Sequence, residues 1–88
     1  MARRIRHVDV GQALEEAGHS ASEFIDGDWD PGYRTAQSGP RRVHVFHDGP
    51  GEADHLTLYT AVLRALDYAV VPEQQDHGGR RRLAVTRP

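Results

Sequence analysis

The sequence contains no cysteine, no lysine and no asparagine. Without cysteine there can be no disulfide bonds, no thiolate metal ligands and no cysteine nucleophile. Long apolar runs are also missing. None approaches the ~20 residues of a membrane-spanning helix, and the basic start at residues 1–6 is not followed by the apolar stretch of a secretory signal. We therefore expect a soluble, cytoplasmic protein that does not enter a membrane.

Arginine supplies all eleven basic side chains, against thirteen acidic ones, and the formal net charge is −2. Lysine serves equally well on a solvated surface, so this bias has no structural cause and indicates a genome of high GC content. Hydrophobic residues make up 38% of the chain and aromatic residues 7%, which is typical of a small globular protein. The 88 residues predict one domain of modest stability, 1–88, with residues 1–8 as a flexible basic arm.

Two segments have the spacing of amphipathic helices. The first is predicted over residues 10–17, with Asp9 as its N-cap and Gln12 completing a capping box. The second, over residues 52–66, is the clearest element of the chain, because its large apolar side chains fall on one half of the helix. These side chains are Leu56, Leu58, Tyr59, Val62, Leu63 and Leu66.

Alternating apolar and polar residues predict two hairpins, one before and one after the second helix. Their strands are expected over residues 33–37 and 42–47, and over 68–71 and 80–86. Residues 22–25 are predicted to be briefly extended and residues 26–32 to form a loop. The predicted fold class is α+β with the order α-β-β-α-β-β. An approximately four-stranded, mainly antiparallel sheet would carry one long amphipathic helix on one face, with Val43, Val45, Leu83 and Val85 pointing inward.

Four short motifs resemble small actinobacterial proteins of unknown function, some of them associated with phages or mobile elements. The motifs are Ala-Gly-His at 17–19, Asp-Gly-Asp-Trp at 26–29, Gly-Tyr-Arg-Thr at 32–35 and Arg-Arg-Leu-Ala-Val-Thr at 81–86. The resemblance covers most of the chain and implies an accessory or regulatory role. It implies no activity and no catalytic residues.

His47, Asp48 and His55 are the candidate metal ligands. His47 and His55 could converge across the loop before the second helix, with Asp48 as a third ligand. The familiar zinc spacings are absent, so the pattern favours hydrogen-bonded imidazoles over a metal site.

Signatures of catalysis and of cofactor binding are absent from the sequence. No serine lies in a nucleophile elbow, and no glycine-rich loop precedes a helix. Alternating carboxylates at 26–30 begin like a calcium loop, but Pro31 stands where that loop needs glycine and Gln37 where it needs glutamate. We expect a non-enzymatic protein without cofactor; a metal-dependent enzyme or metal-binding protein is the least favoured alternative.

Two kinds of binding surface are compatible with these residues. Trp29, Phe46 and Arg42 are of the types enriched at protein-binding hot spots, so the sequence favours a small non-catalytic protein-binding module. It would be a regulator or inhibitor from a high-GC bacterium or its phage. The alternative is sequence-independent nucleic-acid binding through the arginine clusters, Arg41, Arg42, Arg80, Arg81 and Arg82. An exposed hairpin edge would also allow a homodimer.

Overall fold

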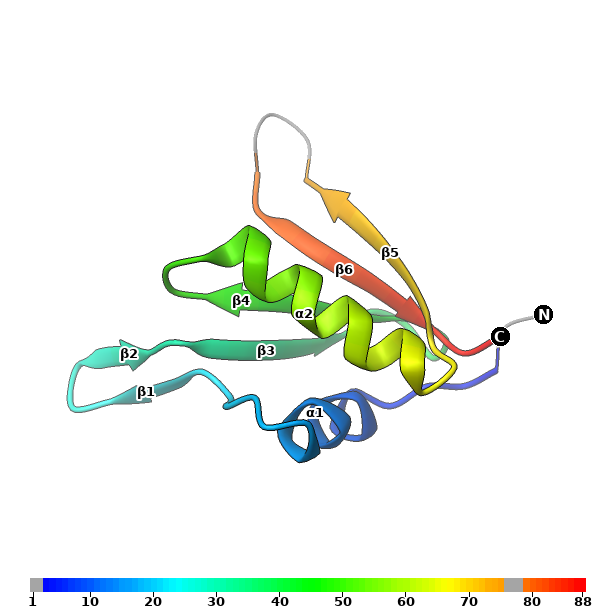
Figure 1. Ribbon diagram of the computed structural model, residues 1–88, viewed down its shortest axis with the longest axis horizontal. Helices are drawn as coiled ribbons and strands as arrows, with labels where there is room; N and C mark the ends of the chain where they lie inside the picture. Colours follow the sequence, from blue (N-terminus) through cyan, green and yellow to red (C-terminus); the bar gives the residue numbers. More distant parts are fainter. Residues whose placement is uncertain (1–2, 76–78) are drawn as a thin grey trace.

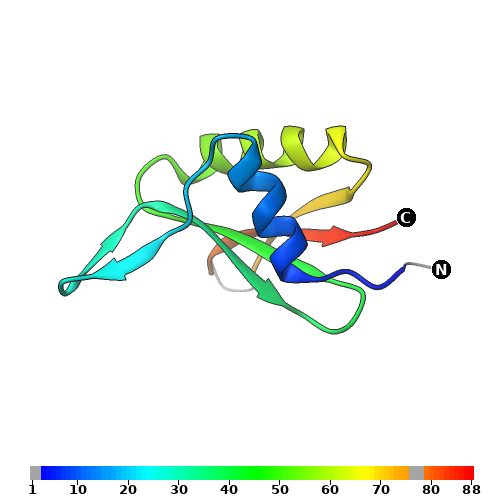
Figure 2. The same cartoon turned by 90° about the horizontal axis from the view of Figure 1, so that it is seen from below.

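A four-stranded antiparallel sheet in the order β3-β4-β6-β5 organises the computed structural model, which describes residues 3–75 and 79–88. Both helices cover one face of this sheet, and a separate two-stranded ribbon, β1-β2, projects from one end (Figures 1 and 2). The elements are α1 (His7–Glu16), β1 (Glu23–Ile25), β2 (Asp28–Asp30), β3 (Gly32–Gln37), β4 (Val43–Asp48), α2 (Glu52–Ala65), β5 (Ala69–Gln74) and β6 (Arg81–Thr86).

The predicted α+β class and the four-stranded antiparallel sheet are confirmed. The predicted order α-β-β-α-β-β omits β1 and β2. It also left the strand order open, and the structure supplies it: β6 lies between β4 and β5 and is antiparallel to both. The segment through α2 therefore carries the chain across the sheet, and the starts of β4 and β6 lie at opposite ends of it. Among the described residues, no helix has the length and the apolar character needed to cross a bilayer.

The hydrophobic core lies between the helices and the sheet. Val43, Val45 and Val85 are fully buried and Leu83 is 2% exposed, so the predicted inward faces of β4 and β6 are confirmed. Opposite them lie the apolar faces of the two helices, from Val10 and Leu14 of α1 and Leu56, Tyr59 and Leu63 of α2. Burial of a large apolar side chain stabilises the fold by roughly 1.5–3 kcal/mol before the loss of entropy.

Helix α1 begins three residues earlier than predicted, and Asp9 is not its N-cap. The N-cap is Arg6, whose side chain makes no capping hydrogen bond. The amide of His7 donates instead to Oε1 of Gln37 at 2.8 Å, and the Gln37 amide group donates to the carbonyl of Ile5 at 2.8 Å. The cap comes from β3, so no local signal could reveal it.

The prediction of a flexible arm over residues 1–8 is wrong for residues 3–8. Ile5 is 2% exposed in the core, and its amide donates to the carbonyl of Pro40 at 3.0 Å. Arg3 forms a β-bridge with Arg87. The apolar side chain of Ile5 thus anchors the segment ahead of α1; residues 1 and 2 lie outside the described part.

Helix α2 follows its prediction to within one residue, but its buried stripe is narrower. Leu56, Tyr59 and Leu63 are buried, whereas Leu58 and Leu66 are 51% and 54% exposed. The helix lies on a sheet that contacts only one side of it, so the flanks of its apolar half remain in solvent.

Candidate binding site

The β1-β2 ribbon is a tight hairpin with a two-residue turn. Its register pairs Glu23 with Asp30, Phe24 with Trp29 and Ile25 with Asp28. The turn residues, Asp26 and Gly27, both have positive φ, at 51° and 86°. This is the conformation of a type I′ turn, for which Asp-Gly is a preferred pair because its twist matches that of the strands.

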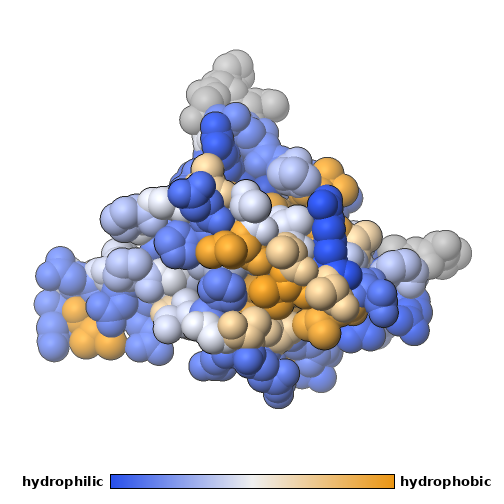
Figure 3. Space-filling model, viewed as in Figure 1, coloured by the Kyte–Doolittle hydropathy of each residue, from blue (hydrophilic) through white to orange (hydrophobic). Residues whose placement is uncertain are grey.

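The two faces of the ribbon differ in chemistry. Phe24 and Trp29 share one face, are each 60% exposed, and have ring centroids 5.3 Å apart. We call this the aromatic face. Ile25, 47% exposed, lies on the other face, which also carries the side chains paired around it, Glu23, Asp28 and Asp30. We call this the acidic face. Figure 3 shows apolar atoms at this end of the molecule, surrounded by hydrophilic ones.

The base of the ribbon is held by a close approach of two backbones. The amide of Tyr33 donates to the carbonyl of Ser20 at 3.0 Å, and the amide of Ser22 donates to the carbonyl of Tyr33 at 2.8 Å. A Cβ at Gly32 would collide with the backbone of residues 20–22. Glycine at this position therefore allows the ribbon to leave the sheet where it does.

A hollow of about 620 Å³ adjoins Trp29, lined also by Arg34, Asp48, Glu52 and Arg80. Asp48 is its electrostatic centre: it accepts from Arg34 at 3.0 Å and from Arg80 at 2.9 Å. Arg80 also lies 3.5 Å from the Glu52 carboxylate. Burial alone would raise the pKa of Asp48, but hydrogen bonds from Ser22, Arg80 and Arg34 outweigh burial and lower it. Asp48 thus stays ionised and holds both guanidinium groups in place.

Only one of the three predicted protein-binding residues lies at this ribbon. Trp29 is exposed there, whereas Phe46 is 9% exposed. The guanidinium carbons of Arg34 and Arg80 lie 4.5 and 5.5 Å from the centre of the Phe46 ring, so little of this ring is left for a partner. Arg42 is exposed at the start of β4, at the far end of the sheet.

The prediction of a loop over residues 26–32 conceals the hairpin and therefore gives no reason to single out Phe24 and Ile25. The signal was present in the Asp26-Gly27 dipeptide, which favours a tight hairpin and brings the residues on either side of it together.

The arginine clusters do not converge. Arg41 and Arg42 precede β4, while Arg80, Arg81 and Arg82 lie at the start of β6, and these two strands are antiparallel neighbours. Arg80 is also paired with Asp48, and the Arg82 guanidinium donates to the Glu73 carboxylate at 3.0 Å. The candidate nucleic-acid residues therefore form two separate groups, and one of the groups is partly neutralised.

The candidate metal ligands come together only in part. The rings of His47 and His55 are stacked, with centroids 3.9 Å apart. Asp48 is the next residue of β4, so its side chain points to the other face of the strand, where it pairs with the arginines. Over residues 3–75 and 79–88, no group of three or more His, Asp or Glu side chains is placed to hold a metal ion. The three-ligand site considered from the sequence does not form.

His47 is instead part of a buried hydrogen-bond chain. Its Nε2–H donates to the carbonyl of Pro50 at 3.1 Å, and its Nδ1 accepts from the hydroxyl of Tyr59 at 2.7 Å. His55 donates through Nδ1–H to the carbonyl of Gly51 at 2.9 Å. Burial, and secondarily the neighbouring His55, lower the pKa of His47. Burial also raises the pKa of Tyr59 to about 12, so both groups are neutral at physiological pH.

Comparison of the chain with protein-family models, with curated proteins and with solved structures finds no match.

Proposed function

We propose that this chain is a small, non-catalytic protein-binding module whose contact element is the aromatic face of the β1-β2 ribbon. One observation carries the proposal: Phe24 and Trp29 are each 60% exposed on a ribbon that stands outside the core. A two-stranded hairpin is marginally stable in water. Two large aromatic side chains exposed on it therefore contribute more to contact with a partner than to the stability of the domain.

The composition of the surrounding surface supports a protein partner. Tryptophan and arginine are the residues most enriched at binding hot spots, and the hollow beside Trp29 holds Arg34 and Arg80 fixed by Asp48 and Glu52. These four charges balance, so the hollow suits an apolar or aromatic side chain of the partner, stacked on Trp29 and the guanidinium planes, better than a charged one. The separation of the arginine clusters favours a protein over a nucleic acid as partner.

The finer parts of the proposal rest on the sequence. A regulatory or inhibitory role follows from the resemblance to small actinobacterial proteins associated with phages or mobile elements. The high-GC bacterial source and the cytoplasmic location are proposed on composition.

Site-specific photocrosslinking in an extract of the source organism tests the proposal. A photoreactive phenylalanine analogue in place of Phe24 reports on the aromatic face, and the same analogue in place of Val71, which is 59% exposed on β5, is the matched control. We expect a discrete crosslinked partner from position 24 and none from position 71. Trp29→Ala in the position-24 protein should reduce the yield about tenfold, because it removes a hot-spot side chain.

Equal crosslinking from positions 24 and 71, or a partner whose yield is indifferent to Trp29→Ala, would reject the aromatic face as the contact element. We expect Arg34→Ala in the position-24 protein to abolish crosslinking. This result would show that the binding site extends into the hollow.

A further inference from the structure

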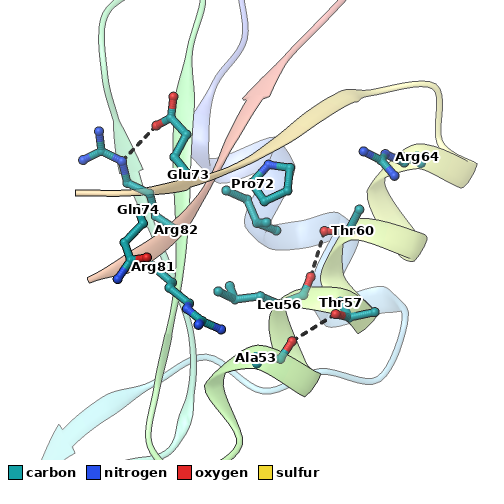
Figure 4. Close-up of a pocket in the computed structure, with 11 residues that line it drawn as sticks. Ala53, Leu56, Thr57, Thr60, Arg64, Pro72, Glu73, Gln74, Arg81 and Arg82 are labelled. Atoms are coloured by element: carbon teal, nitrogen blue, oxygen red, sulfur yellow. Dashed lines mark hydrogen bonds and ion pairs between the residues drawn. The ribbon is translucent and has the colours of Figure 1, made fainter. Parts of the chain in front are cut away.

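A second surface feature lies near the β5 edge of the sheet, opposite the β3 edge from which the ribbon extends. It is a groove of about 550 Å³ between α2 and the strands β5 and β6 (Figure 4). Leu56 from α2, Pro72 from β5 and Leu83 from β6 give it an apolar floor.

The rim of this groove is positively charged. Arg64 of α2 and Arg81 of β6 stand on it. Arg82 and Glu73 alternate with Leu83 and Pro72 along their strands, so their side chains lie on the other face of the sheet, beside His44. Arg64 is fixed by donating to the carbonyl of Val70 at 2.8 Å, and the ion pair of Arg82 with Glu73, at 3.0 Å, lies outside the groove. Arg81 is exposed, and no carboxylate among the described residues lies within ion-pair distance of it. A ligand for this groove must combine an apolar centre with negative charge.

The acidic face of the ribbon has this combination. Ile25 is 47% exposed at the turn end of this face, with Asp28 paired opposite it and the Glu23–Asp30 pair next to it toward the base. We propose that the groove receives the acidic face of the ribbon of a second copy of this chain. Ile25 enters above Leu56 and Leu83, and the carboxylates face the arginine rim.

Geometry makes this contact intermolecular. The ribbon continues into β3, whereas the groove borders β5, and β3 and β5 are the two opposite edges of the sheet. Figure 1 shows the ribbon at the far end of the longest axis, away from β5. A contact between two different surface patches is heterologous, so two copies either exchange ribbons in a closed dimer or extend into a longer chain of copies.

The two faces of the ribbon therefore have different partners. The aromatic face serves the proposed function, and the acidic face serves self-association. Variants of the groove leave the whole ribbon intact, so the two proposals fail independently.

Sedimentation equilibrium of the purified chain, from about 1 µM to about 1 mM, tests self-association. We expect the average mass to rise above the 9.8 kDa of one copy, and to rise less at high salt, because the rim contacts are exposed ion pairs. Asp28→Arg on the ribbon and Arg81→Glu on the groove should each raise the concentration of half-association about tenfold or more. Arg41→Glu makes the same charge change at the far end of the sheet and should leave it unchanged.

Mixing gives the sharpest test. The Arg81→Glu protein keeps an intact ribbon and the Asp28→Arg protein keeps an intact groove, so an equimolar mixture should associate at concentrations where neither variant associates alone. The inference is overturned if the wild-type protein has the mass of one copy at all concentrations. It is also overturned if the mixture stays monomeric, or if Arg41→Glu weakens association as much as Arg81→Glu does. Crosslinking of the heterologous partner at position 24 should persist in the Arg81→Glu protein; it tests the aromatic face alone.

Discussion

His47 shows how one residue can look functional in the sequence and be structural in the fold. Strand alternation places it on the same face as Val43 and Val45, under α2, where it is 2% exposed. A buried imidazole is tolerated when both ring nitrogens are paired, and here the Pro50 carbonyl and the Tyr59 hydroxyl pair them. The pairing also fixes the tautomer, with the proton on Nε2.

The hydroxyl of Tyr59 should therefore matter more for stability than for any activity. Tyr59→Phe keeps the ring in the core but leaves Nδ1 of His47 buried without a donor. We expect the free energy of unfolding to fall by about 1–3 kcal/mol, measured by urea titration at pH 7.5. Tyr68→Phe is the control, because the hydroxyl of Tyr68 accepts only a long hydrogen bond, 3.5 Å from Arg87, at a half-buried site. Its effect on the free energy of unfolding should stay below about 0.5 kcal/mol. Equal effects of the two substitutions would contradict the buried pair.

A second residue-scale prediction concerns pH. Burial lowers the pKa of His44 and of His47, with Arg82 and His55 respectively as the next contributions. The unfolded chain then binds more protons than the folded one below the ordinary histidine value of about 6.5. Stability from these two groups is fully present above that pH and is lost as the pH falls from about 6.5 through the folded pKa values, by at most about 1.4 kcal/mol per pH unit for each histidine.

The substitution His44→Val separates the contribution of His44 to the pH dependence of stability from that of His47. Nε2 of His44 is buried without a hydrogen bond in the structure, so the substitution removes an unsatisfied group and a titrating one together. We expect urea unfolding at pH 7.5 to show stability equal to or above that of the wild type, and the loss between pH 7 and pH 5.5 to be about half as steep. A pH profile unchanged by His44→Val would show that His44 does not titrate in this range.

Among the elements, the β1-β2 ribbon depends most on backbone conformation. Its strands are three residues each and are exposed throughout, so the turn and the Phe24–Trp29 pair hold it together. Gly27→Ala introduces a Cβ at φ 86°, which costs about 1–2 kcal/mol in the left-handed region. We expect the ribbon to open locally, seen as loss of cross-strand nuclear Overhauser effects between Phe24 and Trp29.

The unfolding of the whole domain should shift by less than about 0.5 kcal/mol in the Gly27→Ala protein, because the ribbon lies outside the core. Asp26→Asn provides the control, as Asn-Gly also favours a type I′ turn. A global loss of stability in Gly27→Ala without loss of the cross-strand contacts would mean that the turn is packed against the body of the protein.

Local sequence patterns predicted the inward faces of the sheet and the start of α2, but not the start of α1. The alternation of Val43 and Val45 with His44 determines which face of β4 is buried, and that information is local. The start of α1 could not be predicted in the same way, because the side chain that accepts from its first amide, Gln37, lies in β3, far away in sequence. Helical periodicity gives the centre of an apolar stripe more reliably than its width, so it places Leu58 on the apolar half of α2 although this side chain is 51% exposed.

The candidate site was predictable to the extent that its signals are local. Trp29 stands out by residue type, and the Asp26-Gly27 turn could have identified the ribbon. The burial of Phe46 depends on Arg34 of β3 and on Arg80, which directly precedes β6. Arg34 and Arg80 are far apart in the sequence, so no local pattern shows that both contact Phe46.

At the scale of the whole molecule, the distribution of charge decides between a protein and a nucleic-acid partner. A phosphate chain that neutralised Arg41, Arg42, Arg80, Arg81 and Arg82 together would release counterions from all five contacts. For single strands the slope of log K against log salt would then be about −3.5. The antiparallel pairing of β4 with β6 places these arginines at opposite ends of the sheet, and Asp48 and Glu73 neutralise two of them.

We therefore expect a single-stranded oligonucleotide to bind weakly, with a slope shallower than about −1.5, which corresponds to two phosphate contacts. Fluorescence anisotropy of a labelled oligonucleotide between 20 mM and 200 mM salt, about one decade, measures this slope. Arg81→Ala and Arg41→Ala should reduce the weak binding independently and equally, because no single phosphate chain engages both ends as one surface. A slope near −3.5, or a combined loss much larger than the two separate losses, would show that the arginines act as one surface. The nucleic-acid alternative would then replace the protein-binding function.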